Sequence, residues 1–213
     1  MRWMLGRIWD SLKFGETVLL EHSATTPTAL GLCHLIKWAK GKGYDVLVDD
    51  ILDTLYLYKM QMKLSGCGDE LLDDVKVIKE GGRLEVGKVI ERLPIKEPVI
   101  QEREYRRVFD PLLGGGARVI NPVVGVEKLL LLVSSRREVL TILNNILSFV
   151  GDERRIAFYF INIDVLEGVT PRVLPLLEEI ATTVVRITKD GRSYKFTVAK
   201  SINNEIDGVE IKM

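Results

Sequence analysis

Cysteine is scarce in this 213-residue chain, which contains only Cys33 and Cys67. The two residues are far apart and form no CxxC pair, so the sequence indicates neither a zinc knuckle nor a disulfide framework. We expect Cys33, which falls in a predicted helix, to be a small buried apolar residue. The longest apolar run, at 129–133, has the length of a strand and is too short to cross a bilayer. The chain is therefore expected to be cytoplasmic and to have no membrane partner.

The sequence also has no excess of either charge, because 30 Lys and Arg residues balance 30 Asp and Glu residues. No global field then draws the protein toward nucleic acid. The basic runs at 103–107 and 134–137 are local, and no aromatic-rich basic groove accompanies them, so nucleic-acid binding is not indicated. Charged residues are nevertheless abundant and Gln is almost absent, a balance typical of heat-adapted proteins.

The length of the chain predicts one α/β domain over residues 1–213. Its first 14 residues read as a short amphipathic helix with two tryptophans, too charged to be a spanning helix or a signal peptide. Such a helix could dock on a membrane surface or a partner. We favour the alternative, in which it packs on its own domain.

Strands and helices alternate along the rest of the chain. Thr26 is predicted to cap a helix that begins at Pro27 and ends near residues 41–43. Further helices are predicted at 51–66, 97–113, 136–151 and 171–181, and strands at 16–21, 44–50, 75–80, 87–95, 126–135 and 155–163. Residues 182–200 read as a hairpin that turns at 189–191. This order predicts a three-layer α/β fold, with a mostly parallel sheet between helices and an antiparallel pair at the C-terminal end.

The order and spacing of these elements resemble the RecA-type ATPase core, within it the archaeal KaiC-like and RadA-like branch. The resemblance is carried by GETVLLE, the loop and helix that follow it, YDVLVDD, LLLLVSS and the terminal VVRITKDGRSYKFTVAK. The chain is also similar to a small archaeal family of unknown function that is related to those ATPases. This resemblance implies the P-loop NTPase fold.

The loop after the first strand lacks what a P-loop needs. The pattern GxxxxGK followed by Ser or Thr supplies glycines for backbone amides to close on phosphate, and a lysine to neutralise charge. Glu21, Ala24 and Thr26 stand at glycine positions, Pro27 stands at the lysine, and only Thr28 matches. A left-handed backbone at Thr26 costs roughly 1–2 kcal/mol and a lost charge-assisted contact about 1.5–3 kcal/mol. The affinity for nucleotide is then lower by on the order of a thousandfold, and ordinary ATP binding is not expected.

Two other features implied by the resemblance are also missing. Relatives end the central strand in an aspartate that holds magnesium, whereas Ser134 is the nearest residue here. Relatives place a Lys-x-Arg pair in the terminal hairpin, whereas this chain has Lys200 and, two positions later, Ile202. Loss of several parts of one mechanism favours a pseudo-ATPase, so neither ATPase activity nor a cofactor is expected.

The acidic residues after the second strand allow two readings. Asp49 and Asp50 match the strand end where relatives keep a glutamate that activates water, so they are candidates for a general base or, with Asp53, for a weak magnesium or calcium site. We favour the alternative in which Asp50 caps the next helix and Asp53 lies in its first turn. A hydrolase-like trio of His22, Ser23 and Asp49 is disfavoured because no GxSxG elbow surrounds the serine.

Two functions therefore compete. The first is a non-catalytic RecA-like module that binds a protein or peptide partner or forms a homo-oligomer, most simply a dimer. The second is a small-ligand protein or enzyme that has refitted the former nucleotide cleft around His22, Ser23, Thr25 and Asp49. No residue is assigned a catalytic or metal-binding role. The candidate ligand-binding residues of the altered cleft are His22, Ser23, Ala24, Thr25, Thr26, Pro27, Thr28, Asp49, Asp50 and Ser134.

Overall fold

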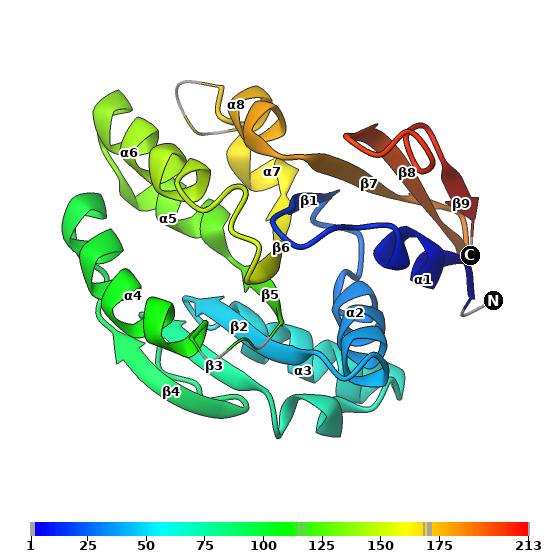
Figure 1. Ribbon diagram of the computed structural model, residues 1–213, viewed down its shortest axis with the longest axis horizontal. Coiled ribbons are helices and arrows are strands. Elements are labelled where there is room, and N and C mark those ends of the chain that lie inside the picture. The colour runs from blue at the N-terminus through cyan, green and yellow to red at the C-terminus, as the bar shows by residue number, and fades with distance from the viewer. Residues whose placement is uncertain (1–2, 115, 117, 168, 170–171, 213) are drawn as a thin grey trace.

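The computed structural model describes residues 3–114, 116, 118–167, 169 and 172–212. The strands of this part of the chain form one mixed sheet, in the order β4-β3-β2-β5-β6-β1-β7-β8-β9 (Figure 1). The strands from β4 through β7 in that order run parallel, and β8 and β9 are antiparallel additions at one edge. Their bounds are β1 Thr17–His22, β2 Asp45–Ile51, β3 Lys76–Glu80, β4 Lys88–Leu93, β5 Val119–Val124, β6 Arg155–Asn162, β7 Thr183–Asp190, β8 Ser193–Ser201 and β9 Glu210–Lys212.

Helices cover both faces of this sheet (Figure 1). One face packs against α1 Trp3–Asp10, α2 Ala29–Gly41, α3 Thr54–Ser65 and the 3₁₀ turn Asp69–Leu72. The opposite face packs against α4 Pro98–Leu112, α5 Val126–Leu132, α6 Arg136–Leu147 and α8 Leu174–Ile180, and the short helix α7 Ile163–Leu166 lies beside α5. The three-layer RecA-like arrangement expected from the sequence is confirmed, and so is the C-terminal hairpin.

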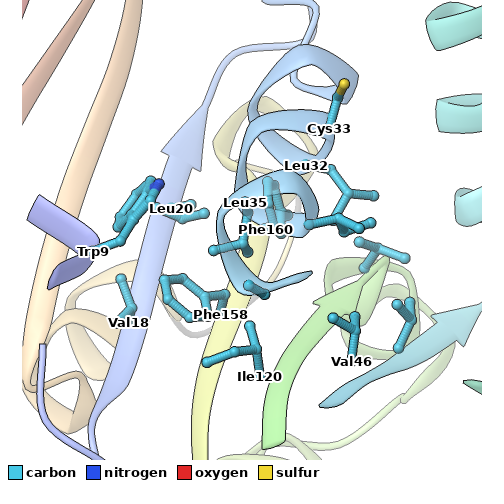
Figure 2. Close-up of a cluster of buried hydrophobic side chains, with 14 of the residues drawn as sticks. Trp9, Val18, Leu20, Leu32, Cys33, Leu35, Val46, Ile120, Phe158 and Phe160 are labelled. Carbon is cyan, nitrogen blue, oxygen red and sulfur yellow. The ribbon is translucent and has the colours of Figure 1, made fainter. Parts of the chain in front are cut away.

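The N-terminal helix α1 is part of the core of the domain. Leu5, Ile8 and Trp9 are buried, and the Trp9 ring meets Phe158 of β6 edge to face at 5.4 Å (Figure 2). Burial of these side chains removes apolar surface from water, which is the main force that holds the helix in place. Helix α1 thus packs against α2 and the sheet. Cys33 of α2 is buried in the same cluster, as expected.

The prediction of a strand at 126–135 is wrong, because residues 126–132 form helix α5. The strand in this part of the sheet is β5, residues 119–124. Four consecutive leucines have neither the 3.6-residue hydrophobic period of a helix nor the alternation of a strand, so the sequence does not distinguish the two. Gly125 marks the switch with a φ of 92°, and any side chain there would collide with Thr54 and the Ile51 carbonyl. Pro122 made β5 hard to recognise, since proline is rare inside a central strand.

Smaller differences concern the ends of elements. Helix α2 begins at Ala29 and not at Pro27, and α8 begins at Leu174, although the start of its predicted range falls on residues outside those described. Strand β9 was not predicted and pairs with β8. Within the described ranges, none of the helices is both long enough and apolar enough to span a membrane.

Candidate functional site

The loop between β1 and α2 does not have the predicted cap. Thr28 occupies the N-cap position of α2, and its side chain makes no capping bond. The Thr26 hydroxyl instead lies 2.9 Å from the Ser23 hydroxyl, and the Thr26 amide donates to the Ser23 carbonyl at 3.1 Å. The predicted Thr26 cap is therefore wrong, because the chain makes a further turn before the helix starts.

The chain closes this loop with its own polar groups. The amide of Ala24 donates to Asp164 Oδ2 at 2.7 Å, so a carboxylate of α7 already occupies a donor that an anion would need. Thr25 is held by a hydroxyl contact of 3.1 Å to Ser23. The only described non-glycine residues with positive φ are Leu52 and Asp53, so no residue of the loop takes the left-handed conformation that a glycine-rich phosphate loop uses.

The two side chains at the end of β1 are buried. Glu21 accepts from Arg186 Nε at 3.0 Å, yet burial raises the pKa of its carboxyl to about 7, a stronger effect than that of the guanidinium. Burial also lowers the pKa of His22, against the opposing effects of Ser23 and Asp164. His22 Nδ1 lies 3.0 Å from the Ser23 carbonyl, to which its N–H donates. His22 is therefore neutral near pH 7 and bound to the chain itself.

The acidic residues of β2 do not join this loop. Strands β5 and β6 lie between β2 and β1, which separates them by about 14 Å at the usual strand spacing. Asp49 contacts Tyr105 of α4, whereas His22 faces Thr28 at the start of α2, on the other side of the sheet. The trio of His22, Ser23 and Asp49 is therefore excluded by geometry, and Asp49 is not part of the cleft predicted around the loop.

Asp50 and Ser134 have structural partners elsewhere. Asp50 Oδ1 accepts from the Leu55 amide in the first turn of α3 at 2.9 Å, and its Oδ2 accepts from the fully buried Lys79 at 2.8 Å. The N-cap residue of α3 is Asp53 and not Asp50, so the prediction that Asp53 lies in the first turn is wrong; Asp53 binds Lys79 at 2.6 Å. Ser134 lies between α5 and α6, where its amide donates to Glu138 at 3.1 Å.

The structure instead shows a cavity on the face of the sheet that carries α4, α5 and α6. Its volume is about 290 Å³, just below the range of roughly 300–1,000 Å³ for small-molecule sites. The walls are mostly apolar and include Val126, Leu129, Ile142 and Ile146. The floor is formed by side chains of β2, β3, β5 and β6, which adjoin in the sheet. The cavity thus combines apolar walls with a floor that contains charged groups.

Buried polar side chains connect along this floor. Asp49 Oδ2 accepts from the Tyr105 hydroxyl at 2.8 Å and from Asn121 Nδ2 at 2.9 Å. The Asn121 oxygen in turn accepts from Arg155 Nη1. Among the described atoms of this network, Asp49 Oδ1 is buried without a hydrogen-bond partner, whereas the Arg155 guanidinium also interacts with the Tyr159 hydroxyl. Buried polar groups are normally paired, so this carboxylate oxygen marks a place where an external donor is expected.

Two carboxyls of the cavity have perturbed acidity. Burial raises the pKa of Asp49 to about 6, although Asn121 and Tyr105 act in the opposite direction. Burial and the nearby Asp49 raise the pKa of Glu80 to about 7, with Gln101 opposing through a 2.6 Å hydrogen bond. Perturbed carboxyls in a pocket are a physical reason to regard it as a functional site.

Sequence reasoning reached Asp49 but missed Glu80, Tyr105, Asn121 and Arg155. The available signal was the presence of charged or amide side chains inside apolar strands, as in VKVIKE, VINPVV and RIAFYF. Such residues are seldom buried without a specific partner. No group of three or more His, Cys, Asp or Glu side chains within the described part of the chain is arranged to hold a metal ion.

Comparisons with known proteins place the chain among archaeal relatives. A solved structure of the Pyrococcus horikoshii OT3 protein PH0250 is 38% identical and has a TM-score of 0.85, with 96% of each chain covered. The flagellar accessory protein FlaH from Methanocaldococcus jannaschii is 14% identical, with a TM-score of 0.55 over 99% of this chain and 90% of that one. The KaiC-like protein PH0186 from Pyrococcus horikoshii OT3 is 12% identical, with a TM-score of 0.58 over 93% and 84%.

The two distant matches support the RecA-like fold and nothing beyond it. A comparison with curated proteins finds no match. The family model described as "Pyrococcus protein of unknown function, DUF257" matches residues 8–212. That range spans nearly the whole chain, and the 38% identical relative covers almost as much of it. The chain therefore belongs to the DUF257 family of Pyrococcus proteins of unknown function.

Proposed function

We propose that this protein is a RecA-like module that acts by binding and does not hydrolyse ATP. The observation that carries the proposal is the closed β1–α2 loop, in which Asp164 takes the Ala24 amide at 2.7 Å. Phosphate would have to displace this carboxylate to reach the amide. The carboxylate opposes an anion, and no lysine in the loop offsets it.

The end of the central strand supports the same proposal. Strand β5 ends in Val123 and Val124, so it offers no carboxylate at the position where the resemblance implies a magnesium ligand. Glu127 follows in the first turn of α5, beyond the end of the strand, and its side chain is buried. Neither element of a Mg-ATP site is then present in the form that the mechanism requires.

The partner in this proposal is a protein or peptide, or a second copy of the chain. Support comes from leucines of α5 and α6 that are about half exposed and offer apolar area to a partner. These are Leu131, Leu132, Leu140 and Leu147. The edge strands β4 and β9 are further places where a chain can add to the sheet.

Two measurements test the proposal. Phosphate release from Mg-ATP should equal the rate in buffer without protein, and a protein-dependent rate that scales with concentration would contradict it. Sedimentation velocity should show a species heavier than the 24.1 kDa monomer without added nucleotide. A 24.1 kDa species alone at every concentration would contradict self-association and would leave a different protein or peptide as the proposed partner.

A further inference from the structure

The floor of the cavity between α4 and α6 contains two carboxylates with no cation bound to them. Among the described residues, the hydrogen-bond donors to Asp49 are the neutral Tyr105 and Asn121, and the donor to Glu80 is the neutral Gln101. Arg155 donates to Asn121 and not to either carboxylate, and its charge acts on Asp49 without a direct hydrogen bond. A buried carboxylate is normally paired with a cation, so the floor is short of positive charge.

The other charged side chains that line the cavity also leave an excess of negative charge. Besides Asp49 and Glu80, the cavity is lined by Glu97, Glu102 and Glu138, against the two cations Lys96 and Arg155. Lys96 pairs with Glu104 at 2.5 Å and Glu102 pairs with Arg106 at 2.9 Å, both with partners outside the cavity, so these two charges do not change the balance. The Arg155 guanidinium lies over the Phe109 and Phe149 rings at 5.1 and 4.6 Å. A mobile cation would therefore find an unbalanced negative site.

Aromatic and aliphatic side chains of the cavity also suit an organic cation. Tyr105, Phe149 and Tyr159 line the cavity, and aromatic rings attract organic cations through their faces. The apolar walls suit a short hydrocarbon body, and a volume of about 290 Å³ admits a small molecule and not a nucleotide together with its phosphates. Asp49 Oδ1, on a side chain that is 2% exposed, supplies an unused acceptor.

We propose that this cavity is a binding site for a small organic cation, an amine with an apolar body, whose ammonium group pairs with Asp49 and Glu80. The apolar body contacts the walls formed by Ile142 and Ile146. The raised pKa values of the two carboxyls agree with this pairing, because a bound ammonium would restore the charge that burial disfavours. The site is on the face of the sheet opposite to α2, so the proposal does not depend on whether the β1–α2 loop binds nucleotide.

The test is calorimetric titration of the full chain at pH 8 with hexylamine, hexanol and hexanoate. The three probes share a hydrocarbon body and differ in charge. Hexylamine should bind with saturable heat, hexanol at least about tenfold more weakly, and hexanoate not at all. Tighter or equal binding of hexanoate, or no saturable heat with hexylamine, would overturn the proposal, and this probe series needs no variant.

Three variants locate the site. Glu80→Gln and Asp49→Asn keep the shape of each side chain and remove its charge, and each should weaken hexylamine binding by at least about tenfold. Asp164→Asn, at the β1–α2 loop, is the matched control and should leave the hexylamine affinity unchanged. Unchanged hexylamine affinity in both folded cavity variants, or weakening by the control alone, would overturn the assignment to this cavity.

Discussion

Replacement of Glu80 by glutamine should make the protein more stable at pH 8 and leave its stability unchanged at pH 4. Glu80 is buried, and its carboxyl receives one hydrogen bond from Gln101, which a glutamine oxygen can also accept. Burial, with the nearby Asp49, raises the pKa of Glu80 from its ordinary value of 4.5 to about 7. The folded protein therefore keeps this proton to a higher pH than the unfolded chain does.

The sign and size follow from proton linkage. Between about pH 4.5 and pH 7 the unfolded chain loses the Glu80 proton before the folded protein does. The contribution of Glu80 to the wild-type free energy of unfolding therefore falls as the pH rises through this range, and it is constant above pH 7. A shift from 4.5 to about 7 corresponds to an upper limit of roughly 3 kcal/mol. Glutamine does not titrate, so Glu80→Gln should raise the unfolding free energy at pH 8 by about 1–3 kcal/mol and by nearly nothing at pH 4.

Urea denaturation at the two pH values measures this difference. Glu21 and Glu127 also have pKa values raised by burial, but they are common to both proteins and largely cancel. Asp49 loses the repulsion of Glu80 in the variant, which adds to the expected gain in stability at pH 8. Glu91→Gln, on the exposed part of β4, is the matched control and should change the stability little at either pH. An equal effect of Glu80→Gln at pH 4 and pH 8, or a loss of stability at pH 8, would refute the reasoning.

Three further changes have expected outcomes. Lys79→Met leaves Asp50 buried without its cation and should lower the urea-unfolding free energy by roughly 3–5 kcal/mol, and no loss would contradict a buried ion pair. Ser135→Ala removes the N-cap of α6 and should cost about 0.5–2 kcal/mol, whereas the control Ser134→Ala should cost less; equal losses would argue against the capping box. A rebuilt phosphate loop should melt at a lower temperature and gain little protection from Mg-ATP, and a fully stable, strongly protected variant would contradict the closed-loop account. That variant carries Glu21→Gly, Ala24→Gly, Thr26→Gly and Pro27→Lys.

Much of the fold could be predicted from sequence because most strands are short apolar runs between turn residues. The strands near residues 16–21, 44–50 and 155–163 and the terminal hairpin all occur within a residue or two of their predicted bounds. The exception is the segment after Gly114, where Asn121 and Pro122 obscure β5 and the leucines of α5 resemble a strand. The secondary structure of that segment depends on long-range packing and not on the local sequence pattern.

The candidate site was less accessible to prediction. Alternation along β2 implies that Asp49 and Asp50 point to opposite faces, but the order of the strands places Asp49 beside Tyr105 and far from His22. The cavity draws its floor from four strands and its walls from three helices, so no short motif contains it. Its only local signal is a polar residue such as Glu80 inside an apolar strand.

Calorimetric titration of the wild-type chain with millimolar Mg-ATP tests the central claim most directly. Asp164 occupies the Ala24 amide and the β1–α2 loop has neither glycine nor lysine, so the titration should give no saturable heat. A dissociation constant in the low micromolar range, equivalent to about −8 kcal/mol of binding free energy, would contradict the account.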